Sequence, residues 1–248
     1  LNNQAMPIKF ERAIVVGASS GIGREVARLL AEEGCKVAVV GRRSDRLQYF
    51  ASAYTGLARA YIHDVRNFEE VPKLLADITK DLGGLDLLFV SAGVMPPVDA
   101  DEFDFGKDNE IWQTNVVGTC AWLNEAAARF QGAGHGCLAA VGSVAGDRGR
   151  KGQPAYNASK AALHAYMEAV RNRLDPLGVA VCTFKPGPVA TEMTSRLKLT
   201  NPMSSEEAAK RIRKKLGVTG DHYLLLTHRI AFAIIRLIPG WLMRRLPI

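Results

Sequence analysis

A glycine-rich turn near the N-terminus is the feature that most restricts how this chain can fold. The apolar run Ala13–Val16 leads into Gly17-Ala18-Ser19-Ser20-Gly21-Ile22-Gly23, and residues 24–33 follow with apolar side chains at helical spacing. A second apolar run covers residues 36–40. This order predicts a βαβ unit with parallel strands: a strand, a glycine turn, a helix and a second strand.

The same alternation continues through the rest of the chain. Strands are predicted at 58–63, 85–91, 136–143, 179–185 and 222–227, and helices at 71–81, 111–130, 155–174, 204–216 and 229–245. Strands that are apolar throughout and separated by helices are typical of a parallel sheet covered on both faces. The sequence therefore predicts a single doubly wound, Rossmann-type α/β domain over residues 6–248. Residues 1–5 are expected to be an added leader before a native start at Met6.

The positive charge of the chain is concentrated in its last segment. The 248 residues include 32 basic and 25 acidic side chains, which give a net charge of +7. Residues 205–248 hold nine of the basic and three of the acidic side chains and so account for +6. A nucleic-acid enzyme more usually spreads basic residues over its working face, so we predict no nucleic-acid partner.

The predicted helix 229–245 is a basic, amphipathic extension of the domain. Its apolar stripe consists of Ile230, Ile234, Leu237, Ile238 and Trp241, while Arg229 and Arg236 lie two turns apart. The first interpretation is packing on the domain or on a second subunit. The alternative is contact with a membrane surface, with Arg244 and Arg245 near the headgroups.

Cysteine and histidine spacing predicts neither disulfides nor a metal site. The four cysteines are widely spaced and form no CxxC pair, which favours free thiols in a reducing, cytoplasmic compartment. His63, His135 and His164 show no metal-ligand spacing with cysteine or acidic residues, so we expect no metal.

The glycine turn and the end of the second strand suit a dinucleotide. Glycines at 17, 21 and 23 remove Cβ atoms where a pyrophosphate approaches, although a bare tight turn is the alternative. A carboxylate at the end of the second strand would favour NAD, but Gly41 is followed by Arg42 and Arg43. Two guanidinium groups suit a 2′-phosphate, so we predict NADP(H); a solvated basic turn is the alternative.

A second group of residues has the composition of a proton-transfer site. Tyr156 and Lys160 are four residues apart on a predicted helix and therefore share a face. A nearby cation lowers the pKa of a tyrosine from its usual value of about 10. Ser143 ends the preceding strand, Asn115 lies in a predicted helix, and Pro186-Gly187 ends the next strand. The carboxyl ends of parallel strands, where open α/β sheets bind ligands, would bring these residues together.

These motifs occur in a fixed order between about Lys9 and Met193. In this the chain resembles the short-chain dehydrogenases/reductases of about 250 residues, and this length is typical of a single domain. The resemblance implies hydride transfer between a nicotinamide and a carbonyl carbon. It implies that Tyr156 is the general acid/base and that Lys160 lowers its pKa and binds the nicotinamide ribose. Ser143 would hydrogen-bond the substrate oxygen, and Asn115 would complete a proton relay through water.

The resemblance also extends the set of cofactor contacts. Asp64-Val65 matches the family's adenine contact, Val189 and Thr191 match its nicotinamide amide contacts, and Ala92-Gly93 matches a turn beside the cofactor. The predicted cofactor-binding residues are Gly17, Ser19, Ser20, Gly21, Ile22, Gly23, Arg42, Arg43, Asp64, Val65, Ala92, Gly93, Tyr156, Lys160, Pro186, Gly187, Val189 and Thr191.

The chain departs from the family pattern at two turns and at its C-terminus. Val16 stands where the family often has threonine, and Val90-Ser91-Ala92-Gly93 where it has Asn-Asn-Ala-Gly; both changes affect turn hydrogen bonds rather than the chemistry. The basic tail replaces a Val-Asp-Gly-Gly ending. In this it resembles the branch with hydroxysteroid, retinoid and other lipophilic-carbonyl reductases, which implies a lipophilic ketone or aldehyde and its alcohol as substrates.

The complete set of Asn115, Ser143, Tyr156 and Lys160 favours an active oxidoreductase over a catalytically idle NADP-binding sensor on the same fold. A homodimer or homotetramer is expected from the resemblance alone.

The sequence leaves two interpretations for each of two loops. Residues 147–151 could bind an acidic substrate group or be a solvated basic loop. Met95, Pro96, Pro97 and Met193 could line an apolar pocket or simply pack within their loops.

Overall fold

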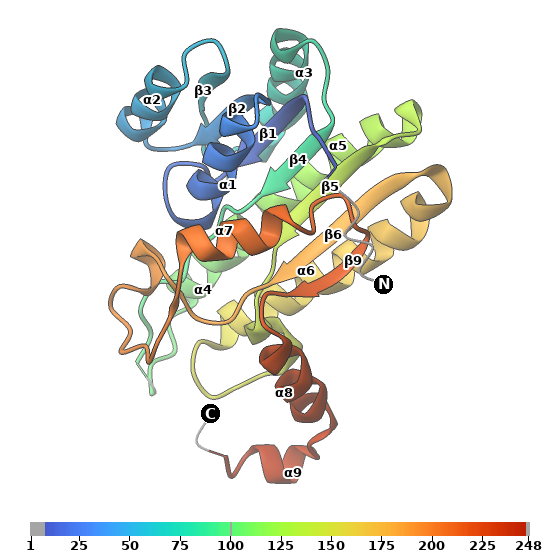
Figure 1. Cartoon of the computed structure of the whole chain (residues 1–248). Coiled ribbons are helices and arrows are strands. Elements are labelled where there is room, and N and C mark those ends of the chain that lie inside the picture. Colours follow the sequence, from blue (N-terminus) through green and yellow to red (C-terminus); the bar gives the residue numbers. More distant parts are fainter. Residues whose placement is uncertain (1–7, 100, 247–248) are drawn as a thin grey trace.

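A seven-stranded parallel sheet forms the centre of the protein, whose computed structural model describes residues 8–99 and 101–246 (Figure 1). The predicted leader, residues 1–5, lies outside the described residues. The strand order is β3-β2-β1-β4-β5-β6-β9, with the topological switch point between β1 and β4. This confirms the predicted doubly wound α/β fold. The strands are β1 (Arg12–Val16), β2 (Lys36–Gly41), β3 (Ala58–Ile62), β4 (Leu87–Val90), β5 (Gly136–Val141), β6 (Val179–Lys185) and β9 (Gly220–Tyr223).

Helices cover both faces of the sheet. On one face, α1 (Gly21–Glu32) packs against α7 (Ser205–Arg213). The other face is covered by α3 (Val71–Leu82), α5 (Thr119–Ala133) and α6 (Pro154–Leu174). Neighbouring residues of the central strands enter opposite cores, which favours apolar side chains at successive positions: Val15 faces the α1 side and Ile14 the α5 side. Burying each such side chain stabilises the fold by about 1.5–3 kcal/mol.

The predicted helix 111–130 is a composite of three segments. It begins earlier, as α4 (Phe105–Ile111), passes through a π-helical segment at Trp112–Gly118, and continues as α5. Apolar periodicity cannot reveal a π segment, because the helix widens without ending. The end of this segment packs closely on another part of the chain: a Cβ at Gly118 would lie only 2.4 Å from the Val65 carbonyl oxygen. A π segment of this kind often occurs at a functional site.

The C-terminal prediction was wrong in its boundaries. The predicted strand 222–227 is displaced, because β9 pairs with β6 from Cys182↔Gly220 to Lys185↔Tyr223 and ends where β6 ends. The following leucines belong instead to α8 (Leu226–Leu237) and the turn before it. The predicted helix 229–245 is divided at Pro239 into α8 and the short α9 (Gly240–Met243). Both helices extend beyond the sheet (Figure 1).

Three short segments complete the chain around the site. The helix α2 (Ser44–Ala53), which was not predicted, follows the arginines at the end of β2. The strands β7 (Val189–Ala190) and β8 (Met203–Ser204) form a second, two-stranded sheet. The 3-10 turn Glu192–Thr194 lies between them.

Candidate active site

A pocket of about 920 Å³ opens at the carboxyl ends of the parallel strands, where doubly wound sheets bind ligands. It includes most of the predicted site residues, while Gly23, Asp64 and Asn115 do not line it. The predicted residues that line it are Gly17, Ser19, Ser20, Gly21, Ile22, Arg42, Arg43, Val65, Ala92, Gly93, Ser143, Tyr156, Lys160, Pro186, Gly187, Val189 and Thr191.

The glycine turn is shaped by close backbone contacts. A Cβ at Gly17, whose φ is +86°, would lie 2.5 Å from the Ala92 nitrogen, and one at Gly23 would lie 2.3 Å from the Gly17 oxygen. Gly23 therefore allows the turn to pack rather than lining the pocket. Ser20 at the N-cap of α1 makes no side-chain capping bond, although serine at this position often does. The first N–H groups of α1 are thus free for an anion, which fits a dinucleotide pyrophosphate.

Arginines gather where β2 enters the pocket. Arg43 donates from Nε and Nη2 to the Ser19 hydroxyl, at 3.0 and 2.9 Å, and its Nη1 lies 2.5 Å from the Glu192 carboxylate. Arg46 pairs with the same carboxylate. The side chain of Arg42 is half exposed. Arg46 and Glu192 were missed in the sequence, although the position of Arg46 three residues after Arg43 could have indicated it.

Asp64 lies beside the pocket rather than on its wall. The Arg66 guanidinium donates to this carboxylate, with Nη2 at 2.6 Å from Oδ2, and holds the pKa of Asp64 below its usual value. Arg42 approaches it at 3.8 Å. Of the predicted adenine pair, Val65 therefore lines the pocket and Asp64 supports its edge.

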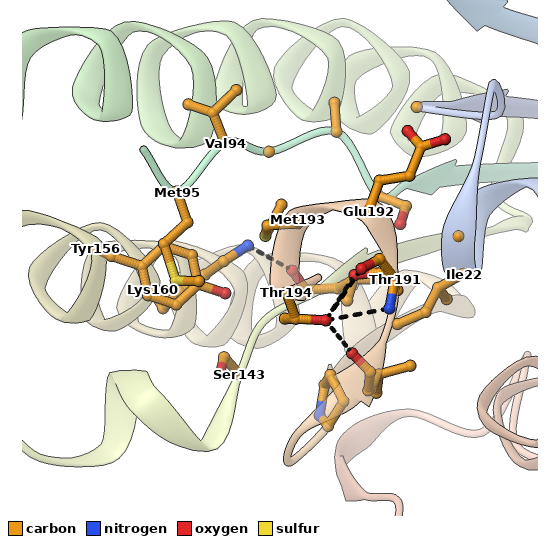
Figure 2. A pocket seen from close by; sticks show the side chains of 18 of the residues that line it. Ile22, Val94, Met95, Ser143, Tyr156, Lys160, Thr191, Glu192, Met193 and Thr194 are labelled. Carbon is orange, nitrogen blue, oxygen red and sulfur yellow. Dashed lines mark hydrogen bonds between the residues drawn. The ribbon is translucent and has the colours of Figure 1, made fainter. Parts of the chain in front are cut away.

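Tyr156 and Lys160 lie together on α6, on the same side of the pocket as Ser143 (Figure 2). Lys160 Nζ is 5.7 Å from the centroid of the Tyr156 ring and donates to the Val141 carbonyl at 3.0 Å. Among the described residues no carboxylate pairs with this ammonium group. Burial therefore lowers the pKa of Lys160 to about 8.

Tyr156 is subject to opposing influences. Burial is the largest influence and raises the pKa of its hydroxyl above the usual value of 10.0, although the Ser143 hydroxyl and the positive charge of Arg150 act to lower it. The expected lowering of this pKa by Lys160 stays a prediction. The Ser143 hydroxyl also accepts from the Ala145 N–H at 3.0 Å. Ser143 is therefore held by its own turn and is positioned to share a ligand oxygen with Tyr156.

Asn115 is buried behind the pocket wall, in the π-helical segment. Its Oδ1 accepts from the Val94 N–H at 2.7 Å, and its Nδ2 donates to the Val94 carbonyl at 3.0 Å and to the Ser159 hydroxyl at 3.2 Å. The side chain thus joins the segment after β4 to α6. Its predicted role in a proton relay stays a prediction.

The loop between Ser143 and Tyr156 contributes Arg150, from the basic loop considered in the sequence, and Gln153, which sequence reasoning did not single out. Arg150 and Gln153 line the pocket, and Arg150 Nε and Gln153 Oε1 are buried without a hydrogen-bond partner. Gln153 has a φ of +56°, a left-handed conformation that costs about 1–3 kcal/mol. Asp147 is instead buried beneath the pocket, so residues 147–151 are not simply a solvated loop.

Apolar side chains form the remaining wall. Met95, Pro96, Pro97 and Met193 all line the pocket, as one of the two interpretations of these loops predicted. Figure 2 shows Met95 beside Tyr156 and Met193 between Lys160 and the Thr191–Thr194 turn. Thr194 fixes that turn through hydrogen bonds to Val189 and Thr191.

The fold and this site define a dinucleotide-binding α/β protein with a tyrosine–lysine pair. The sequence profile of the short chain dehydrogenase family matches residues 11–202. A Myxococcus xanthus protein described as an uncharacterized oxidoreductase is 34% identical over 219 residues, which cover 86% of each chain. The chain belongs to the short-chain dehydrogenase/reductase family of oxidoreductases, which use NAD(P) cofactors.

Solved structures agree with this assignment. A short chain dehydrogenase/reductase family protein has a TM-score of 0.76 and 30% sequence identity, with 87% of this chain and 97% of that chain covered. A structure titled "ElxO with NADP Bound" has a TM-score of 0.74 at 21% identity, covering 83% of this chain and 90% of the other. The second likeness shows the shared fold.

Proposed function

We propose that this protein is an NADP(H)-dependent oxidoreductase that interconverts a lipophilic ketone or aldehyde and the corresponding alcohol. One observation carries the proposal. Three groups meet at one end of the pocket: the Tyr156 hydroxyl, the Ser143 hydroxyl and the buried Lys160 ammonium. The glycine turn lines the other end of the same pocket. A proton donor, an oxygen-binding hydroxyl and an unpaired cation are the groups that carbonyl reduction needs.

The roles follow from the positions of these side chains. When bound, the nicotinamide supplies or accepts the hydride. Tyr156 gives its proton to the substrate oxygen during reduction and removes it during oxidation, while Ser143 donates a hydrogen bond to the same oxygen. The positive charge of Lys160, 5.7 Å from the Tyr156 ring, stabilises the phenolate that proton transfer leaves behind. Arg150 adds to this effect.

Preference for NADP(H) rests on the arginines at the end of β2. Arg43 and Arg46 hold the Glu192 carboxylate, which supports the binding of an anion at this corner. Arg42, which is half exposed and 3.8 Å from Asp64, adds a third guanidinium group. The NADP in the ElxO structure is consistent with an NADP site on this fold. The uncapped N-terminus of α1 would hold the pyrophosphate.

Cofactor titration tests the preference. We expect NADPH to bind at least about tenfold more tightly than NADH, because bidentate arginine–phosphate pairs contribute well over 1 kcal/mol. Arg43→Ala is expected to weaken NADPH binding and leave NADH binding nearly unchanged; Arg24→Ala, on the outer surface of α1, is the matched control. Equal or tighter NADH binding by the unaltered protein would contradict the preference.

The apolar wall formed by Met95, Pro96, Pro97 and Met193 supports a lipophilic substrate. The substrate class is tested by following NADPH oxidation with a panel of steroids, acyl ketones, quinones and sugars. We expect turnover with apolar carbonyl compounds and none with sugars.

Tyr156→Phe tests the chemistry itself. Removing the hydroxyl should lower kcat by about 10²–10⁴-fold, the usual contribution of a general acid/base, without weakening NADPH binding. Tyr166→Phe, on the same helix, is the matched control and should retain activity. Near-normal turnover by Tyr156→Phe would remove this residue from its proposed role.

A further inference from the structure

The two C-terminal helices carry an apolar stripe that no other described part of the chain covers. Its members are between 55% and 84% exposed, whereas Phe232 and Met243 on the same helices are buried against the domain. Packing of the stripe on the domain, part of the first interpretation of the sequence, is therefore wrong; a different side of α8 meets the domain. The exposed stripe differs from the predicted one in having Leu226 in place of the half-buried Ile238. It consists of Leu226, Ile230, Ile234, Leu237 and Trp241, spaced three or four residues apart.

Specific contacts hold the stripe in a fixed orientation. Arg236 Nη2 donates to the Tyr223 hydroxyl at 2.7 Å, and Arg148 Nη2 donates to the Ile238 carbonyl at 2.8 Å, close to the break between α8 and α9. His228 lies so close to Gly187 that a Cβ there would be 2.1 Å from its ring. The stripe thus faces away from the body as part of the folded domain.

The charge around the stripe has one sign. Arg229, Arg236, Arg244 and Arg245 are exposed on these helices, and the sequence has no Asp or Glu after Asp221. A second copy packed on the same face would place arginines against arginines, with no carboxylate from either copy's tail to pair them. An anionic surface complements both the stripe and the charge.

We propose that the face formed by α8 and α9 docks on a membrane surface that contains anionic lipid. The stripe enters the boundary between headgroups and acyl chains, and Arg229, Arg244 and Arg245 contact lipid phosphates. Arg236 stays bonded to Tyr223. The contact is peripheral: within residues 8–99 and 101–246, no helix combines the length and apolarity needed to cross a bilayer.

This docking would bring the lipid surface close to the pocket. The helix α8 packs on the 3-10 turn Val144–Asp147, which directly follows Ser143, and His228 contacts Gly187. Ser143 and Gly187 both line the pocket. A lipophilic substrate would then reach the pocket from the bilayer, a consequence that rests on the proposed function, whereas the docking itself does not.

Vesicle flotation of the full chain tests the docking without measuring activity. We expect the protein to float with phosphatidylcholine vesicles that contain phosphatidylglycerol, to float less with pure phosphatidylcholine, and to be released by high salt. Ile234→Glu combined with Leu237→Glu should weaken partitioning at least about a hundredfold, because two apolar anchors are lost. Arg244→Gln with Arg245→Gln should weaken it about fivefold per arginine.

The control is Leu177→Glu, which alters an exposed leucine of similar character at the amino end of β6, away from α8. It should float as the unaltered protein does. Retained NADPH binding shows that each variant is folded. If the Ile234→Glu, Leu237→Glu variant does not fold, the Arg244→Gln, Arg245→Gln variant still tests the docking independently.

Failure of the unaltered protein to float with anionic vesicles would overturn the proposal. Sedimentation of the protein without lipid gives a second way to overturn it. If the protein is a dimer and Ile234→Glu dissociates that dimer, the stripe binds another copy of the chain rather than a membrane. If the panel of carbonyl compounds shows no turnover but flotation persists, only the proposed function fails.

Discussion

Two lysines are buried at the catalytic end of the sheet, and their surroundings differ completely. Lys185, at the end of β6, is 3% exposed and lies 3.2 Å from Asp147 and 2.6 Å from Asp221. Lys160, on α6, is 5% exposed, and its polar contact in the described chain is the Val141 carbonyl. One ammonium group is fully paired, and the other is left with a single neutral acceptor.

The difference separates a structural charge from a functional one. The network around Lys185 continues from Asp221 to Arg171 on α6, and from Asp147 through Tyr223 to Arg236 on α8. It therefore ties α6, β6, β9 and the tail together. Burial would raise the pKa of Asp221, but hydrogen bonds from Lys185 and Arg171 hold it below its usual value. Lys160 has no such compensation, and burial lowers its pKa to about 8. An uncompensated buried charge beside a pocket is a mark of a functional site.

Replacing Lys160 should produce the largest effect, and it should be on activity. Lys160→Met is expected to lower kcat/KM by about 10²–10⁴-fold, because Tyr156 loses the charge that stabilises its phenolate. The free energy of unfolding should stay equal or rise, because an unpaired buried charge has been removed. Steady-state kinetics and urea unfolding measure the two quantities. Lys151→Met, on the exposed loop, is the control, and a strongly destabilised Lys160→Met would contradict the comparison.

Replacing Lys185 should show the opposite pattern. Lys185→Met leaves Asp147 and Asp221 without their shared cation, and it should lower the free energy of unfolding by about 3–5 kcal/mol. The fraction that remains folded should bind NADPH normally. Adding Asp147→Asn to Lys185→Met should recover part of the lost stability. If urea unfolding shows Lys185→Met to be as stable as the unaltered protein, the network does not stabilise the fold.

The pH dependence of stability should distinguish Lys160 from other groups. Its pKa is about 8 when folded and 10.5 in its ordinary state, so between these values the unfolded chain binds a proton that the folded chain has released. Stability relative to Lys160→Met should therefore rise as the pH increases from 8 to 10.5, by about 3 kcal/mol in total. Urea unfolding of both proteins across this interval measures the difference, and a constant difference would show that Lys160 is not shifted.

His164 provides a corresponding effect on stability at acidic pH. Its Nε2 accepts from the Ser143 N–H at 3.4 Å, and its Nδ1 is 3.5 Å from Asp147, beside the paired lysine. Burial, assisted by Lys185, lowers its pKa from 6.5 to about 4, so the unfolded chain binds the extra proton in this interval. Stability should fall as the pH drops from 6.5 to 4, by about 3 kcal/mol more than in His164→Gln. If the free energies of unfolding of the two proteins change in parallel over this pH interval, the predicted contribution of His164 is wrong.

Local patterns were sufficient to predict the sheet, the glycine turn and the tyrosine–lysine pair. The strands are recognisable because both of their faces are buried, and Tyr156 and Lys160 because four residues make about one helical turn. The same reasoning failed at 222–227, because the apolar residues after Tyr223 suit a strand but have no partner beyond the end of β6. The helix predicted at 111–130 is present, but its earlier start and its π segment, which contacts the Val65 backbone, were missed.

Contacts between distant segments could not be read from the sequence. Glu192 meets Arg43 across 149 positions, and Asp147 meets Lys185 across 38. The residues next to Lys185 in the sequence do not reveal that it is paired with carboxylates while Lys160 is not. Likewise, the residues next to Leu226 do not reveal that the exposed stripe begins there. These facts depend on which side of each element faces the body.

The sequence by itself determined the order of strands and helices, the parallel sheet and the residues that reach its carboxyl edge, because these follow from local periodicity and backbone sterics. Only the tertiary structure decided which buried charges are paired, which side of α8 meets the domain, and which apolar side chains stay exposed. The reason is physical. Pairing and burial depend on distances between segments that the chain brings together only when it folds.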